Sequence, residues 1–279
     1  MQDTRTTHFT QYLIEKADQG YRGTTFLSGL EKFDNKLKGI KTRELITITG
    51  KTGEGKTLFA ESWCNRIMES NEKAKVCLFS YEVPAEEMLA KYVHDTDKPI
   101  YVPMQLECMD TEWLYKTCKH AKETHGCNIF MFDHLHFLVD MNTKLNMSLN
   151  IGGFMRGLKM DIATQLDVGV ILIAHQRGVP KGEDPSLEGI RDSALVAAES
   201  DSVIVVWRRK NFDQEALDKI ENESPILAER IRQRTLEKPE EGDSYSHNFA
   251  VVQIAKSRRT GTYRWSKLFQ KVGYYLEEV

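Results

Sequence analysis

The stretch ITITGKTGEGKT, from Ile46 to Thr57, runs from an apolar, β-prone segment into a glycine-rich turn and ends on Gly-Lys-Thr. Its last eight residues, beginning at Gly50, satisfy the pattern G-x-x-x-x-G-K-[ST]. A predicted strand precedes the pattern and a predicted helix follows it, which is the context in which the pattern binds phosphate. We therefore predict a phosphate-binding loop rather than a glycine-rich turn that arose by chance.

The residue types of this loop suit a nucleoside triphosphate. Glycines let backbone N–H groups close around the β-phosphate, and the N-terminus of the following helix adds positive potential. The Lys56 ammonium is expected to reach the β- and γ-phosphates, and the Thr57 hydroxyl to ligate Mg²⁺. The predicted nucleotide-binding residues are Gly50, Lys51, Thr52, Gly53, Glu54, Gly55, Lys56 and Thr57.

The composition indicates a globular chain with a large core. Its 279 residues are 41% hydrophobic and 28% charged, which suits one substantial domain with attachments or two small ones. A formal net charge of -3 excludes a surface that coats polyanions throughout, so any nucleic-acid contact must be local. The five cysteines have no metal-ligand spacing, and we expect them to be reduced and packed in the interior.

No apolar run approaches the roughly 20 residues that span a bilayer, and the N-terminus is too acidic for a signal or transit peptide. We therefore expect no membrane partner and a cytosol-like compartment, that of a prokaryotic or phage-infected cell, with the mitochondrial matrix as the alternative.

Apolar, β-prone runs alternate with helical patterns along the chain. This alternation predicts an α/β fold with a mostly parallel central sheet flanked by helices. The expected strands are 45–49, 76–81, 128–133, 168–174 and 202–207, and the expected helices are near 56–70, 84–94, 111–125 and 151–166.

The ends of the chain differ from this pattern. Residues 1–22 predict an amphipathic helical arm or linker, and residues 23–279 the main domain. Residues 210–246 are charged and poor in large apolar side chains, and we interpret them as an insertion. The β-prone runs 247–256 and 260–270 predict a C-terminal β-hairpin.

Two acidic residues follow predicted buried strands. Asp133 ends the strand of NIFMFDH and is a candidate to hold Mg²⁺, although an aspartate that starts a turn is the plain alternative. Glu82 follows the strand of VCLFSYEV, and carboxyl ends of adjacent parallel strands meet at one crevice. Glu82 is therefore placed to polarise the attacking water, whereas Glu86 and Glu87 read as surface charges.

His175 and Gln176 end the strand of VGVILIAHQRG. Their place in the strand series favours a sensor of the γ-phosphate over a pair of solvated loop residues. The sequence does not decide which of the two is the sensor.

Six ordered segments resemble the RecA-type ATPase domain of the superfamily 4 replicative DNA helicases, the ring-forming family of DnaB, the phage primase-helicases and Twinkle. The match runs from about Phe26 to Phe269 and implies a RecA-like P-loop NTPase core. The segments are LSGLEKFDNKLKGIKTRELITITGKTGEGKT, FSYEVPAEEM, MFDHLHFL, FMRGLKMDIATQLDVGVILIAHQ, SLEGIRDSALVAAESDSVIVVWRR and IAKSRRTGT.

The resemblance assigns roles to single residues. Glu82 matches the family's catalytic glutamate, and Asp133 matches its metal-binding aspartate. His175 matches a histidine of the Twinkle and phage branches, whereas Gln176 matches a glutamine of DnaB.

Lys256 and Arg258 match the family's finger residues, which reach the γ-phosphate held by a neighbouring protomer. Arg259 is the alternative to Arg258. The chain is basic and free of acidic residues between positions 256 and 271, which implies an anionic partner. The other basic side chains of this run are interpreted as solvated residues that protect an edge strand: Arg264, Lys267 and Lys271.

The resemblance places DNA contacts on loops that face the channel of a ring. The matching segments are VDMNTKLNMSLN, residues 139–150, and RGVPKGEDPSLEG, residues 177–189. Their basic residues are Lys144, Arg177 and Lys181, and ordinary exposed loops are an equal alternative for each. Contacts of this kind grip phosphates without reading bases.

The resemblance thus implies an ATP-dependent, ring-forming replicative DNA helicase that translocates 5′ to 3′ on single-stranded DNA. It couples hydrolysis at subunit interfaces to duplex unwinding. The expected cofactors are ATP, or another NTP, and Mg²⁺. The expected partners are single-stranded DNA at a replication fork, further copies of the chain in a hexameric ring, and a separate primase or loader. The alternatives are a RecA- or KaiC-like ATPase of recombination or regulation, and a nucleotide-gated DNA-binding scaffold without unwinding.

Overall fold

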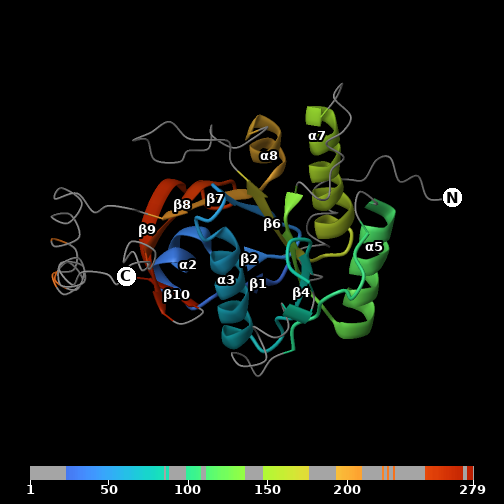
Figure 1. The fold of residues 1–279 in the computed structure, drawn as a ribbon, viewed down its shortest axis with the longest axis horizontal. Coiled ribbons are helices and arrows are strands. Elements are labelled where there is room, and N and C mark those ends of the chain that lie inside the picture. Colours follow the sequence, from blue (N-terminus) through green and yellow to red (C-terminus); the bar gives the residue numbers. More distant parts are fainter. Residues whose placement is uncertain are drawn as a thin grey trace, which may run out of the picture.

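The computed structural model describes residues 23–84, 86–87, 99–107, 111–135, 147–175, 193–208, 222, 225, 229, 249–272 and 275–278. The predicted arm (1–22), nearly all of the predicted insertion (210–246) and most of the predicted helix near 84–94 lie outside the described residues. Within the described ranges, one large sheet carries helices on both faces (Figure 1).

The helices begin with the short α2 and the longer α3, and two later helices end in a wider, π-helical turn. The helices are α2 (Glu31–Leu37), α3 (Lys56–Ser70), α5 (Thr111–His120) continued by η1 (Ala121–His125), α7 (Met147–Gly157) continued by η2 (Leu158–Thr164), and α8 (Ser193–Glu199).

The strands form a two-stranded and an eight-stranded sheet. They are β1 (Thr25–Phe26), β2 (Ile40–Lys41), β3 (Leu45–Gly50), β4 (Val76–Ser80), β5 (Ile129–Asp133), β6 (Gly169–His175), β7 (Ser202–Arg208), β8 (Phe249–Ser257), β9 (Tyr263–Val272) and β10 (Tyr275–Glu278).

The large sheet has the order β10-β9-β8-β7-β3-β6-β5-β4. The five strands from β7 to β4 are parallel, and β8, β9 and β10 continue the sheet in antiparallel fashion. The predicted α/β fold class is therefore confirmed, and each predicted parallel strand begins and ends within one residue of the observed one. The predicted C-terminal hairpin is the pair β8–β9.

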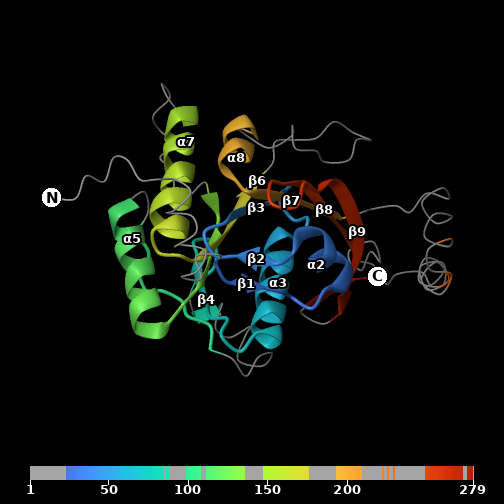
Figure 2. The ribbon, with the colours of Figure 1, turned by 180° about the vertical axis from the view of Figure 1, so that it is seen from behind.

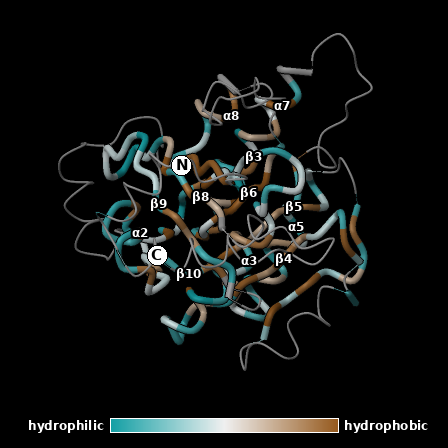
Figure 3. Tube along the Cα trace, turned by 60° about the vertical axis from the view of Figure 1, so that its left-hand side comes forward, coloured by the Kyte–Doolittle hydropathy of each residue, from teal (hydrophilic) through white to brown (hydrophobic). Residues whose placement is uncertain are grey.

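The parallel strands are buried on both faces, which explains their continuous apolar sequences. One face packs against α2 and α3 through Ile46, Ile48 and their neighbours. The other packs against α5 and α7 through Phe130 and Phe132, among others. Hydrophobic segments accordingly follow the central strands, and hydrophilic ones lie at the periphery (Figure 3).

The two ends of the molecule differ in character. In both ribbon views, α5 and α7 stand side by side at one end and the antiparallel strands close the other (Figures 1 and 2). The first half of β9 pairs only with β8, because β10 covers only residues 269–272. Arg264 and Lys267 therefore lie on an edge that no described strand pairs with.

In the part of the chain that the structure describes, no helix is long and apolar enough to cross a membrane. Four cysteines among the described residues, Cys64, Cys77, Cys118 and Cys127, are free and buried, as predicted.

Candidate nucleotide-binding site

The predicted phosphate loop, residues 50–57, leaves the carboxyl end of β3 at the middle of the sheet and leads into α3. Gly50 passes close to β7, and a Cβ at this position would lie 2.2 Å from the Val206 carbonyl oxygen. Gly55, the residue before α3, has a φ of 91°, and no described side chain caps the helix. The first N–H groups of α3 are therefore free of a side-chain acceptor at the loop, where they favour an anion.

The Lys56 side chain folds back over the loop. Its Nζ donates a hydrogen bond of 2.8 Å to the Lys51 carbonyl, and the residue is only 5% exposed. Burial lowers the pKa of Lys56 below its usual value, although the Asp133, Glu82 and Glu54 carboxylates oppose this shift. An ammonium group held here is short of counter-charge and solvent, so a phosphate is a favourable partner for it.

Thr57 and Asp133 meet at the start of α3. The Thr57 hydroxyl donates a hydrogen bond of 2.9 Å to Oδ2 of Asp133, although 76 residues separate them in sequence. Asp133 is 4% exposed and ends β5, two strands from the loop. Two hard oxygen donors therefore converge beside the loop, as Mg²⁺ requires.

Glu82 lies beside two histidines at the same edge of the sheet. Its Oε1 is 2.9 Å from His134 Nδ1 and 3.5 Å from His175 Nε2. The two imidazole rings are 4.1 Å apart between centroids and inclined by 75°. Burial and the Lys56 ammonium lower the pKa of His175, and the Glu82 carboxylate opposes this change.

The register of the sheet explains why these residues meet. His175 ends β6 directly beside Gly50 of β3, and Asp133 ends β5 beside β6. Glu82 follows β4, the next strand along. A cavity of about 230 Å³ opens at this edge, the phosphate cavity, lined by Thr52, Gly53, Gly55, Lys56, Thr57, Leu58, Glu82, His175 and Arg208.

Two residues of this site were not singled out from the sequence. His134 directly follows Asp133, and Arg208 ends β7 and lines the phosphate cavity. The Arg208 backbone N–H donates a hydrogen bond to the Glu54 carboxylate, which ties the loop to β7. Both residues stand where a parallel strand ends, so the rule that found Glu82 and His175 would also have found them.

Lys256 and Arg258 lie far from the phosphate loop of their own chain. Ser257, between them, pairs with Ser202 at the start of β7, whereas Arg208 at its end lines the phosphate cavity. The six residue steps from Ser202 to Arg208 span about 20 Å at roughly 3.3 Å per residue. These two residues, the basic pair, therefore lie near the opposite edge of the sheet.

Inside the protomer the basic pair contacts the carboxyl end of α8. Lys256 Nζ donates to the Ala197 carbonyl and, at 3.3 Å, to that of Ser200, and Arg258 donates to the Ala198 carbonyl. Burial and the neighbouring Arg258 lower the pKa of Lys256, against the attraction of Asp201. Cations at this end of a helix compensate its unpaired carbonyls.

Arg259 has partners elsewhere in its own chain. Its guanidinium donates hydrogen bonds to the carbonyls of Leu37, Lys38 and Gly39 at the end of α2. It also forms an ion pair of 2.7 Å with Glu44. These contacts assign Arg259 to the fold, so we keep Arg258 and not Arg259 as the finger candidate.

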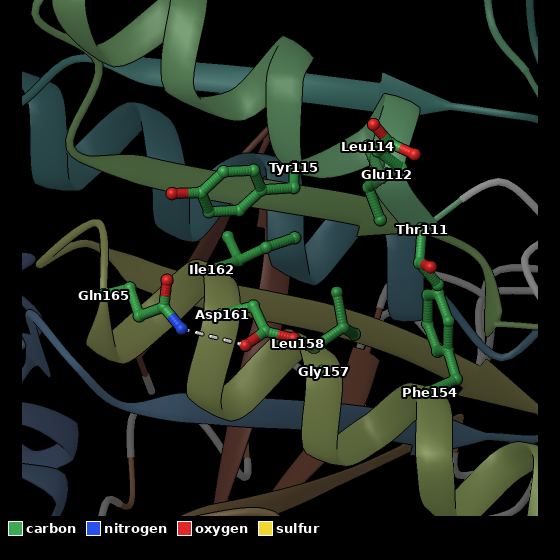
Figure 4. A pocket seen from close by; sticks show the side chains of 10 residues that line it. All are labelled: Thr111, Glu112, Leu114, Tyr115, Phe154, Gly157, Leu158, Asp161, Ile162 and Gln165. Atoms are coloured by element: carbon green, nitrogen blue, oxygen red, sulfur yellow. Dashed lines mark hydrogen bonds between the residues drawn. The ribbon is translucent and has the colours of Figure 1, made fainter.

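A second cavity of about 270 Å³ lies between α5 and the α7–η2 helix (Figure 4). Leu114 and Tyr115 face Phe154 and Ile162 across it, and its polar groups lie at the rim. No predicted site residue lines it.

Four predicted site residues lie outside the described residues: Gln176, Lys144, Arg177 and Lys181. The last four residues of the predicted loop 139–150 form the first turn of α7, so the loop prediction is wrong there. Met and Leu, which occupy two of these positions, are strong helix formers.

A phosphate loop on a central parallel strand, with acidic residues at the ends of neighbouring strands, defines the class of RecA-type P-loop nucleotide-binding domains. The family model described as "DnaB-like helicase C terminal domain" matches residues 25–105 and 92–272. The chain belongs to this family.

Characterised relatives agree at low identity. The replicative DNA helicase DnaB of Pasteurella multocida (strain Pm70) is 23% identical over 242 residues, 74% of this chain and 51% of the relative. The replicative DNA helicase DnaC of Bacillus subtilis (strain 168) is 22% identical over 227 residues, 69% and 49% of the two chains. The chain spans about half the length of these relatives.

Solved structures share the fold. One of them, a separate ATPase domain, matches with a TM-score of 0.66 at 17% identity, covering 99% of this chain and all of that one. A DnaB-like replicative helicase, solved in a study of its interactions with primase, matches with a TM-score of 0.65 at 18% identity, covering 99% and 67%. The RecA-like core implied by the sequence is thereby confirmed.

Proposed function

We propose that the protein is an ATP-dependent DNA helicase that works as a ring of identical subunits. The observation that carries the proposal is the separation of two half-sites: the phosphate loop at one edge of the sheet and the basic pair near the other. Such a chain completes a hydrolysis site only when the basic pair of a second copy approaches its loop.

The residues of the loop half-site divide the work of hydrolysis. Backbone N–H groups of residues 50–57 and the Lys56 ammonium bind the phosphates. Thr57 and Asp133 offer oxygen ligands that fit Mg²⁺, which when bound neutralises charge on the β- and γ-phosphates. Glu82 lies on the wall of the same cavity and is placed to accept a proton from the attacking water.

His175 adds a contact between the loop and this base. Its Nδ1 lies 3.5 Å from the Thr52 hydroxyl, while its Nε2 faces Glu82. We assign His175 the role of γ-phosphate sensor, because it touches both the loop and the general base. Movement of this side chain on loss of the phosphate would be passed along β6.

In the ring, Arg258 and Lys256 leave the carbonyls of α8 and stabilise the charge that develops on a phosphate bound to the neighbouring chain. Loops beyond the described residues, with Lys144, Arg177 and Lys181, are proposed to hold single-stranded DNA. A separate primase or loader is proposed as a partner, since one structural neighbour was studied for its interactions with primase.

The proposal is tested by ATP turnover with and without single-stranded DNA, by fork unwinding, and by light scattering. We expect DNA-stimulated turnover and fork unwinding from an oligomer, and unwinding lost in Glu82→Gln and Arg258→Ala. Arg258→Ala should still bind nucleotide, because its own loop is intact. Arg264→Ala, an exposed arginine of the same hairpin, is the matched control and should remain active. Turnover by a stable monomer that ignores DNA would contradict the proposal, and an oligomer with DNA-stimulated turnover but no unwinding would favour the scaffold.

A further inference from the structure

The group formed by Glu82, His134 and His175 has a donor set that the hydrolysis reaction does not require. One ligand atom from each residue lies within 4.8 Å of the others. Two imidazoles and one carboxylate suit Zn²⁺ and similar ions, whereas Mg²⁺ prefers oxygen ligands alone. We propose that these three residues form a binding site for Zn²⁺ or another first-row transition-metal ion.

The spacing of the donor atoms fits a tetrahedral ion. With ligand bonds of about 2.0–2.2 Å, two ligands of such an ion are roughly 3.3 Å apart. The distances from Glu82 Oε1 to His134 Nδ1 and His175 Nε2, 2.9 and 3.5 Å, lie on either side of this value. The remaining separation is at most 4.8 Å, so closing the set takes a side-chain shift of roughly 1.5 Å or less.

The surroundings supply an outer partner and an open position. The second nitrogen of His175, Nδ1, lies 3.5 Å from the Thr52 hydroxyl, and a metal-bound histidine commonly donates its other N–H to such a group. The His134 side chain is 7% exposed and the Glu82 side chain 40%. The site is thus firm on one side and open to the phosphate cavity on the other, which leaves a fourth position for water or a phosphate oxygen.

An ion held here takes the carboxylate that we assign as general base. This consequence rests on the proposed function. Bound Zn²⁺ would stop hydrolysis while Lys56 and the backbone N–H groups still bind the nucleotide. Thr57 and Asp133, the Mg²⁺ ligands, are not part of the site, so excess Mg²⁺ should not displace the ion.

The direct test is a titration of the full chain, first stripped of metal, with Co²⁺ as a coloured substitute for Zn²⁺. We expect one equivalent of Co²⁺ with the intense visible absorption of a tetrahedral ion, displaced by Zn²⁺ and not by Mg²⁺. Loss of an outer-shell partner alone lowers metal affinity 10–100-fold, so removal of a ligand in His175→Ala should lower it by roughly 100-fold or more.

Two controls keep this test decisive. The chain has eight histidines, and His125→Ala removes an exposed one that also stands near a second histidine, His120. This variant should bind Co²⁺ as the wild type does. His134 is buried and His134→Ala can fail to fold, so the half-exposed Glu82, changed to Gln, serves as the second ligand variant.

Tetrahedral Co²⁺ binding that persists in both His175→Ala and Glu82→Gln, or that disappears in His125→Ala, would overturn the site. Absence of any Co²⁺ or Zn²⁺ binding by an active ATPase would do the same. If the metal-free protein shows no ATPase at all but binds one Co²⁺ through these residues, the proposed function fails and the metal site stands. A fluorescent ATP analogue should bind equally well with and without Zn²⁺.

Discussion

Mixed rings of two inactive variants test whether the basic pair acts across a subunit boundary. Lys56→Ala removes the phosphate-binding ammonium but leaves Arg258 intact. Arg258→Ala leaves the loop intact and removes the finger. A complete site in a mixed ring joins the loop of an Arg258→Ala subunit to the Arg258 of a Lys56→Ala subunit.

The size of the effect follows from the geometry. The basic pair lies near the opposite edge of the sheet, about 20 Å along β7 from the phosphate cavity. Arg258 therefore cannot serve its own loop. With equal amounts of the two variants assembled at random, about one interface in four is complete in a head-to-tail ring. Loss of an arginine finger lowers kcat by about 10³–10⁵-fold, so each parent is nearly silent. If interfaces turn over independently, the mixture should reach about a quarter of the wild-type ATP turnover.

The assay uses the two variants co-expressed with different affinity tags and purified through both. The control pairs Lys56→Ala with Glu82→Gln, whose lesions both lie in the loop half-site. No interface of that mixture is complete, so its turnover should stay at the level of the parents. The trans reasoning is refuted if the first mixture is no more active than its parents, or if the control is restored equally.

Three further predictions concern the fold and the loop. Gly50→Ala places a Cβ 2.2 Å from a carbonyl oxygen of β7 and should lower the free energy of unfolding by about 3 kcal/mol. Gly53→Ala has no atom within 4 Å of its Cβ and should cost only about 1 kcal/mol at its positive φ, so equal urea midpoints would contradict this account. Arg259→Ala leaves the Glu44 carboxylate buried without its guanidinium and should cost about 2–3 kcal/mol, less than a fully buried pair because Arg259 is 24% exposed. A loss below about 1 kcal/mol in urea unfolding would be too small for the proposed clamp. Thr57→Val should remove the Mg²⁺-dependent part of ATP affinity and leave binding in EDTA unchanged, which calorimetry can measure.

The sequence predicted the sheet well because its parallel strands are buried on both faces. A strand such as Ile129–Asp133 is apolar at every position but the last, so both its location and its end are visible in the sequence. The meeting of Thr57 and Asp133 followed from the same rule, since both stand where a strand ends.

Contacts to the main chain could not be predicted in this way. Lys256 and Arg258 bind carbonyl groups of α8, and every residue has a carbonyl, so the acceptors carry no sequence signature. The same holds for Arg259 at the end of α2. A basic run identified the donors, and only the structure separated the two arginines.

The start of α7 was missed for a different reason. The polar segment before it was interpreted as a loop, but Met147 and its neighbours form the first turn of the helix. Local helix preference exceeded the average polarity of the segment there.

The single sheet that carries both half-sites also fixes how they move. β3 holds the phosphate loop and β8 holds the basic pair, and β7 is hydrogen-bonded to both. A subunit that turns as a rigid body therefore shifts its two edges in opposite directions. With half-sites about 20 Å apart, a tilt of about 5° displaces each by roughly 1 Å, and a misplacement of this size can cost about 100-fold in rate. Each subunit is thus a short lever, and a tilt that closes one interface loosens the next.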